Sequence, residues 1–311
     1  MPALVRKLSG HYWTLAPSIL HSLRPARAPE ARPWSTTVTS HDGRRVRLSG
    51  MLRDVASSDQ LVVIVHGLGG TFESHYIVRA ASVLDVAGFS TLRLALRGAD
   101  RSGEDFYHAG LVADLHAAFE SPELARFRHL FVLGYSLGGH VSLHASVERH
   151  DPRLAAVAAV CAPLHLDNSA TAIDAPGQLV YRRHVLTGLK EIYAAVAAKH
   201  DVPTPLARVQ RIETIREWDA LTVVPRYGFA DVNDYYARMS VGFRLGAITV
   251  PTFLLPSRLD PMVPPWTFEE LLPAASASLE VRWIEQGGHV GYPTQAAIEL
   301  QVARFFESQA G

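Results

Sequence analysis

Short apolar runs recur along the chain, and most of the segments between them have the spacing of amphipathic helices. The run at residues 61–65, Leu-Val-Val-Ile-Val, is continuous, as expected for a strand that is covered on both faces. Similar runs predict strands at residues 90–96, 129–135, 155–161, 250–256 and 278–284. The turn sequence Ser-His-Asp-Gly at residues 40–43 separates residues 36–39 from 45–52 and predicts an antiparallel hairpin before them.

Helical patterns alternate with these runs. They predict helices at residues 72–87, 109–120, 141–149, 266–272 and 294–307. An alternation of apolar strands with amphipathic helices indicates a mostly parallel, doubly wound α/β sheet.

The alternation stops between residues 163 and 248. This stretch has helical patterns, such as the one over residues 178–199, and no clear buried strand. We therefore predict a mainly helical insertion that packs over the sheet as a cap. The predicted organisation is a lead-in at 1–35, a core formed by 36–162 and 249–311, and the cap at 163–248.

The lead-in contains a segment at residues 12–23 that can form an amphipathic helix, followed by a Pro-, Arg- and Ala-rich segment at 25–33 that we expect to be extended. Such a helix either docks on the protein's own surface, the more common arrangement, or lies on a membrane. No run approaches the ~20 apolar residues of a spanning helix, and no signal-peptide pattern is evident. We expect a cytoplasmic protein, and peripheral membrane contact stays open.

Composition narrows the function classes. The 311 residues are 48% hydrophobic, which is enough for a large core, and 30 Lys and Arg balance 30 Asp and Glu. A chain without a basic field gives no indication of nucleic-acid binding. The single cysteine, Cys161, excludes an intramolecular disulfide and lies in an apolar run, where we expect a buried thiol. The oligomeric state stays open.

One predicted strand-to-helix junction carries a reactive motif. The apolar run at residues 129–135 leads into Gly-Tyr-Ser-Leu-Gly at residues 134–138, and a helical pattern follows. In this context a Gly-x-Ser-x-Gly motif predicts a sharp turn that exposes the serine hydroxyl. Gly134 and Gly138 are expected where neighbouring backbone comes too close for a side chain. Ser136 is therefore the candidate nucleophile.

A serine nucleophile needs a base, and the base needs an orienting acid. Asp260 follows the predicted strand at 250–256, and His289 follows the predicted strand at 278–284. The chain order Ser136, Asp260, His289 is that of the α/β-hydrolase triad. In these roles Ser136 attacks an acyl carbon, His289 transfers the proton, and Asp260 orients the imidazole. Taken singly, Asp260 could be a turn residue and His289 an ordinary histidine.

Two backbone N–H groups are candidates for binding an oxyanion. Leu137 follows the nucleophile, and Leu68 lies in a Gly-rich loop after an earlier strand. In the same loop, His66 is expected to support the backbone through hydrogen bonds, next to Gly67. Arg97 also follows a predicted strand, and we expect it to hold a neighbouring loop rather than contact substrate.

Two further polar groups have simpler explanations. His140 and His144 have an i,i+4 spacing that can bind a metal, but no Glu accompanies them and no third ligand is evident, so we favour packing or solvent contact. Asp105, Tyr107 and His108 are interpreted as loop structure. The predicted chemistry requires no metal and no organic cofactor.

Several motifs together resemble one branch of a known superfamily. They are His-Gly-Leu-Gly-Gly (66–70), Leu-Arg-Gly (96–98), Gly-Tyr-Ser-Leu-Gly-Gly (134–139), Thr-Ile-Arg-Glu-Trp-Asp (214–219), Tyr-Gly-Phe (227–229), Asp-Tyr-Tyr (234–236), Leu-Asp-Pro (259–261) and Gly-Gly-His-Val-Gly (287–291). From residue 35 to 308 the chain resembles the YheT-like (EMB8-type) branch of the α/β-hydrolases. The resemblance implies a carboxylesterase or lipase-like serine hydrolase whose triad matches Ser136, Asp260 and His289. Many relatives carry two acids before the proline, where this chain has Leu259 and Asp260.

The expected activity is hydrolysis of a small-molecule ester or acyl lipid through an acyl-serine intermediate, as in lipid metabolism. Transfer of the acyl group to an alcohol would use the same residues and stays open. A non-catalytic binding protein is a further alternative, because fold does not determine function. Cap aromatic residues, including Trp218, Tyr227, Phe229, Tyr235 and Tyr236, are expected mainly in the cap core, with an acyl-chain lining as the alternative.

Overall fold

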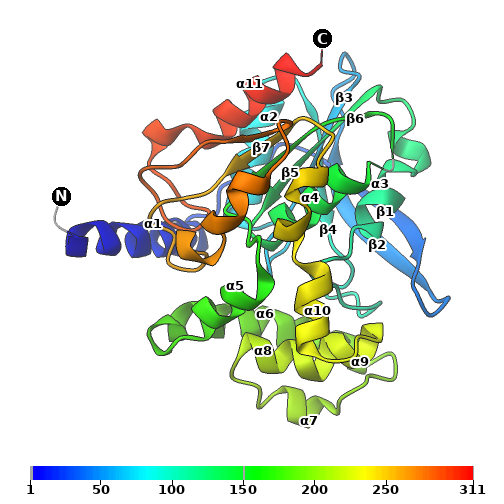
Figure 1. Ribbon diagram of the computed structural model, residues 1–311. Helices are drawn as coiled ribbons and strands as arrows, with labels where there is room; N and C mark the ends of the chain where they lie inside the picture. The colour runs from blue at the N-terminus through cyan, green and yellow to red at the C-terminus, as the bar shows by residue number, and fades with distance from the viewer. Residues whose placement is uncertain (1–2, 150, 311) are drawn as a thin grey trace.

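The computed structural model describes residues 3–149 and 151–310, and within them the strands form one eight-stranded sheet (Figure 1). The strands are β1 (Arg32–Thr39), β2 (Arg45–Arg53), β3 (Gln60–Val65), β4 (Ser90–Ala95), β5 (His129–Tyr135), β6 (Leu154–Val160), β7 (Thr252–Leu255) and β8 (Leu279–Val281). Their order is β1-β2-β4-β3-β5-β6-β7-β8. β2 is antiparallel to β1 and β4, and the remaining pairs are parallel. The α/β-hydrolase fold predicted from the sequence is confirmed.

Helices cover both faces of this sheet. Those of the core are α2 (His75–Val86), α3 (Ala113–Phe119), α4 (Leu137–Glu148) and α11 (Ile298–Ser308). In β3, Val63 belongs to the buried cluster that contains α3 and α4, whereas Ile64 belongs to the cluster that contains α2 and α11. This burial on both faces explains why the central strands have continuous apolar sequences.

The insertion between β6 and β7 contains helices and no strand among its described residues. Its helices are α5 (Leu166–Asp174), η2 (Pro176–Gln178), α6 (Leu179–Ala197), α7 (Leu206–Val209), α8 (Ile215–Trp218), the π-helical η3 (Asp219–Val223), α9 (Val224–Tyr227), α10 (Val232–Met239) and η4 (Val241–Ala247). Figure 1 shows α5 to α10 gathered below the sheet. The hydroxyl of Tyr227 donates to the carbonyl of Phe106, and the hydroxyl of Tyr235 accepts from the Ala109 N–H at 2.9 Å. These bonds fasten the cap to a core loop.

Two predicted helices differ from the helices that the structure contains. The predicted helix at 109–120 is helical only in α3, and the Ala109 N–H, four residues before α3, donates to the cap. The predicted helix at 266–272 forms the 3₁₀ turns η5 (Pro265–Thr267) and η6 (Glu269–Ala274), where Pro265 and Pro273 supply no N–H. A further 3₁₀ turn, η7 (Thr294–Ala296), precedes α11.

The N-terminal helix is longer than predicted. α1 spans Ala3–Leu23 instead of residues 12–23, and β1 begins at Arg32, within the segment expected to be an extended lead-in. Among the residues with a described structure, none of the helices is long and apolar enough to cross a membrane. α1 lies on the core beside the loops that follow β7 and β8, and these loops carry Asp260 and His289.

Candidate active site

Ser136 lies on a strained turn between β5 and α4. Its backbone has φ +53° and ψ −123°, a region that side-chain-bearing residues seldom occupy. A Cβ atom at Gly138 would collide with the carbonyl oxygens of Val65 and His66 at the end of β3. The glycine therefore lets α4 begin directly against the sheet, with Ser136 at the carboxyl edge.

The structure brings the three predicted triad residues together in one hydrogen-bonded series. The Ser136 hydroxyl donates to His289 Nε2 at 2.8 Å, and His289 Nδ1–H donates to Asp260 Oδ2 at 2.7 Å. Asp260 and His289 are buried, whereas Ser136 is half-buried. An imidazole in this arrangement can take the serine proton while the carboxylate holds its tautomer.

The loop after β7 fixes the orientation of Asp260. Its second carboxylate oxygen, Oδ1, accepts from the backbone N–H groups of Met262 and Val263 at 2.8 and 2.9 Å. With both oxygens engaged, the carboxylate has a defined plane, and Oδ2 points toward the imidazole. A second acid beside Asp260 is not needed for this geometry, and Leu259 occupies that position.

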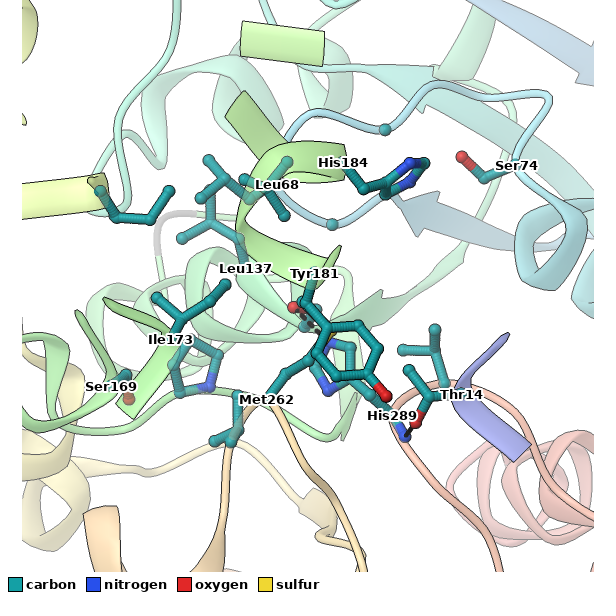
Figure 2. A pocket seen from close by; sticks show the side chains of 18 of the residues that line it. Thr14, Leu68, Ser74, Leu137, Ser169, Ile173, Tyr181, His184, Met262 and His289 are labelled. Carbon is teal, nitrogen blue, oxygen red and sulfur yellow. Dashed lines mark hydrogen bonds between the residues drawn. The ribbon is translucent and has the colours of Figure 1, made fainter. Parts of the chain in front are cut away.

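α1 supplies a contact that sequence reasoning missed. The Thr14 hydroxyl accepts from the backbone N–H of His289 at 2.8 Å and donates to the carbonyl of Gly10 at 2.7 Å (Figure 2). Thr14 thus fixes the backbone of the loop that carries the imidazole. No motif around Thr14 signals this role, because its partner lies 275 residues away.

Two N–H groups near Ser136 are available for an oxyanion. Among the hydrogen bonds of the described residues, neither Leu68 N–H nor Leu137 N–H donates to a protein acceptor. Leu137 is the first residue of α4, where N–H groups have no partner within the helix. The loop of Leu68 abuts the nucleophile, since a Cβ at Gly67 would lie 3.0 Å from Ser136 Cβ.

Tyrosine hydroxyls and a histidine hold this Gly-rich loop. Tyr76 accepts from the Gly67 N–H at 3.0 Å, and Tyr107 accepts from the Gly69 N–H at 2.7 Å. His66 Nε2 accepts from the Leu96 N–H at 3.2 Å, so its Nδ1–H donates to the Gly67 carbonyl at 2.8 Å. Burial lowers the pKa of His66 to about 4, which keeps the ring neutral.

Arg97 lies away from the cavity, buried in an ion-pair network. Its guanidinium Nη2 lies 2.6 Å from Asp114 Oδ1, and its backbone N–H donates to Asp114 Oδ2 at 2.8 Å. Asp105 Oδ2 lies 3.6 Å from Arg97 Nη1 and 2.8 Å from Nη2 of Arg226, a residue of the cap. Arg97 and Asp105 therefore tie a core loop to the cap.

A cavity of about 580 Å³ opens at Ser136, between the core, the cap and α1. Its walls differ in polarity: Figure 2 shows Leu68, Leu137 and Ile173 on one side, where Ser169 is the polar residue labelled among them, and Ser74 and His184 on the other. A volume of this size is typical of a site for a small organic ligand.

The polar side contains a cluster of histidines from three helices. The rings of His21 and His75 lie 6.2 Å apart, and His184 interacts electrostatically with His75. Burial, followed by the charges of Arg79 and both histidines, lowers the pKa of His75 to about 4. His75 is therefore neutral at pH 7, and its buried Nε2 atom has no hydrogen-bond partner among the described residues.

Some of the cap aromatic residues line the cavity, and others pack within the cap. Trp218, Tyr235 and Tyr236 line the cavity, whereas Tyr227 and Phe229 pack in the cap without reaching it. Tyr107 and His108, for which the sequence favours a loop role, also line the cavity.

His140 and His144, for which the sequence favours packing or solvent contact over metal binding, have protein partners. His140 and His144 each place Nε2 within 2.7 and 3.0 Å of the Met239 carbonyl. Cys161, Asp260 and His289 offer ligand atoms within 4.8 Å of one another. Burial raises the pKa of the Cys161 thiol, however, and a protonated thiol is a poor metal ligand.

The chain is similar to known hydrolases in sequence and in fold. The chain is 29% identical to YheT of Escherichia coli (strain K12) over 245 residues, which are 74% of this chain and 70% of that protein. It is 26% identical over 267 residues to the medium-chain fatty acid ethyl ester synthase/esterase 2 of Saccharomyces cerevisiae (strain ATCC 204508 / S288c), covering 75% of this chain and 58% of the yeast protein.

A solved structure has the same fold at low sequence identity. The esterase Pf2001 of Pyrococcus furiosus matches with a TM-score of 0.60 and 17% identity, covering 92% of this chain and 99% of that one. The family model described as serine aminopeptidase, S33, matches residues 56–290. From β3 to the loop that carries His289, therefore, the chain belongs to this α/β-hydrolase family of serine hydrolases, and within it resembles the YheT-like branch.

Proposed function

We propose that this protein hydrolyses carboxylic esters with an apolar acyl group, through an acyl-serine intermediate. The observation that carries the proposal is the hydrogen-bonded series Ser136–His289–Asp260, whose first two members line a cavity with one apolar side. The esterase names of the yeast and Pyrococcus proteins support the same reaction class.

The proposed reaction has two halves. Ser136 Oγ bonds to the acyl carbon as its proton passes to His289 Nε2, and the N–H groups of Leu68 and Leu137 stabilise the oxyanion. The bond to the alcohol oxygen then breaks, and the alcohol leaves with the proton from His289. In the second half, a water molecule gives its proton to His289 and attacks the acyl carbon, which releases the acid and restores the serine.

The cavity favours a neutral ester over the substrate of an aminopeptidase. Recognition of a free α-ammonium group calls for a carboxylate, and the single acidic residue among the described residues of the lining is Asp219. Burial raises the pKa of Asp219 to about 7, and the Tyr236 hydroxyl donates to it at 2.7 Å. Asp219 is thus a poor partner for a cation near pH 7.

The apolar side of the cavity is suited to an acyl chain. α5 contributes Leu166, Ala170 and Ile173, and the following cap helices contribute Trp218 and Val223. These five side chains are buried in the structure, so an acyl chain between them would leave water. Each methylene group buried in this way contributes about 0.8 kcal/mol.

A series of p-nitrophenyl esters of increasing chain length tests this assignment. We expect kcat/KM to rise up to about fourfold per methylene group until the cavity is full, because each group adds about 0.8 kcal/mol. Ala170→Leu should shift the optimum to shorter chains, while Thr171→Leu, on the exposed side of the same helix, should not. A profile that falls steadily from the acetyl ester would contradict an acyl-chain site.

Acyl transfer to an alcohol is the second candidate, and the name of the yeast relative as an ester synthase supports it. The polar side of the cavity, lined by His21, His75 and His184, is suited to an alcohol as well as to a leaving group. Product analysis with an ester and added ethanol separates the two reactions. Free acid as the main product indicates hydrolysis, and accumulation of the ethyl ester indicates transfer.

A further inference from the structure

α1 has two faces with different surroundings. One face lies on the catalytic loops: Thr14 binds the His289 backbone, and a Cβ at Gly10 would collide with the carbonyl of Leu259, next to Asp260. Its backbone therefore touches the loops of both the acid and the base. Figure 1 shows α1 as the dark blue helix extending from the side of the molecule.

The opposite face is apolar and exposed. Leu8, Tyr12, Ile19 and Leu23 follow one another at intervals of four, seven and four residues, so they form one stripe along the helix. Their exposed fractions are 59, 60, 58 and 75%, and Leu20 beside them is 61% exposed. Single exposed apolar residues are common on protein surfaces, but an aligned row of large ones indicates an interaction site.

This stripe is continuous with the rim of the cavity. Ile19 lines the cavity and is also more than half exposed, and the same holds for Val180 of α6, which is 63% exposed. Residues that are exposed to solvent and also line a cavity mark its opening. A surface bound along the stripe would therefore face the entrance to Ser136.

The charge of this region points to an anionic partner. Residues 1–29 contain Arg6, Lys7, Arg24 and Arg27, and they contain no Asp or Glu. An exposed apolar helical face accompanied by basic residues is the combination that binds the surface of an anionic membrane.

We propose that α1 is an interfacial helix that seats the mouth of the cavity on an anionic lipid surface. The side chains of Leu8, Tyr12, Ile19, Leu20 and Leu23 enter the boundary between head groups and acyl chains. Because the inner face of the helix holds the catalytic loops, lipid binding and the active site share one element.

Vesicle sedimentation tests the proposal independently of any activity. Wild-type protein and Ser136→Ala should both bind vesicles of phosphatidylcholine and phosphatidylglycerol. Leu8→Glu/Leu23→Glu should bind at least about 10-fold more weakly, because it removes the burial of two large side chains. The matched control Val86→Glu replaces a 90% exposed apolar residue of α2 and should bind like wild type.

Two further measurements complete the test. Arg24→Gln/Arg27→Gln should weaken binding to the anionic vesicles and reduce its sensitivity to salt. Leu8 and Leu23 do not line the cavity, so the double variant should retain wild-type hydrolysis of a soluble short ester. The proposal is overturned if wild type fails to bind the anionic vesicles, or if the stripe variant binds as well as wild type. A dimer that is lost in the stripe variant, without vesicle binding, would assign the stripe to self-association.

Discussion

Thr14 shows how a residue far from the motifs can act on the site. Its hydroxyl is the acceptor for the backbone N–H of His289, so it sets the position of the imidazole without touching the ring. A hydrogen bond of this kind contributes about 1 kcal/mol, and a buried donor left without a partner costs about 1–3 kcal/mol. Thr14 is thus a positioning residue, and its effect should appear in the rate of the chemical step.

Thr14→Val removes the acceptor at nearly constant volume. We expect kcat to fall about 10-fold because the imidazole is less well placed, while KM for a short ester changes little. Thr14→Ser keeps the hydroxyl and should restore most of the rate. If Val and Ser variants have equal kcat values at equal thermal stability, the hydroxyl has no positioning role.

Residues of the site differ in how well the sequence predicts them. Ser136, Asp260 and His289 each follow a predicted strand, and parallel strands bring their carboxyl ends to one edge, so chain order alone suggests that they meet. Thr14, Tyr181 and His184 approach the site from helices, where local sequence does not specify a distant partner. Their contribution depends on tertiary contacts.

At the scale of elements, the cap contains an acid that couples its stability to pH. Asp219 begins the π-helical η3, is 9% exposed and has a pKa raised from 3.8 to about 7 by burial. Burial favours the neutral acid in the folded state. The contribution of Asp219 to the free energy of unfolding is therefore greatest below pH 3.8, where the carboxyl is protonated in the folded and the unfolded state. It declines as pH rises and is lost above pH 7. The shift corresponds to on the order of 4 kcal/mol.

Asp219→Asn should therefore raise thermal stability in a pH-dependent manner. The amide stays neutral and can still accept from Tyr236, so the gain in Tm should be small near about pH 5 and larger near about pH 8.5. Asp201→Asn, in the exposed loop after α6, is the control and should shift Tm equally at both values. A gain for Asp219→Asn that is the same at both pH values would show that the carboxyl is ionised throughout.

Elements were predictable where local pattern and burial agree. The central strands have side chains buried on both faces, and their apolar runs reveal them. The segment 266–272 has a helical pattern but forms 3₁₀ turns; Pro265 and Pro273 flank it, and Pro273 lacks the N–H with which an α-helix would continue. α1 begins nine residues before its predicted start at residue 12, since its exposed face is apolar and conceals the usual polar and apolar alternation.

At the scale of the whole molecule, three separate parts of the chain build the cavity. The sheet supplies the loops of Ser136, Asp260 and His289, the cap supplies the apolar wall, and α1 closes the side next to His289. The family match covers residues 56–290, so it includes the loops of Ser136, Asp260 and His289, and α1 lies outside the matched range.

The central claim is that Ser136 becomes acylated, and covalent labelling by a fluorophosphonate probe tests it most directly. We predict that wild-type protein takes up one label, located on Ser136 by mass spectrometry of the peptide, and that Ser136→Ala takes up none. Asp260→Asn should be labelled much more slowly, by about 10⁴-fold, because the imidazole tautomer is no longer held. Equal labelling of wild type and Ser136→Ala would contradict the account.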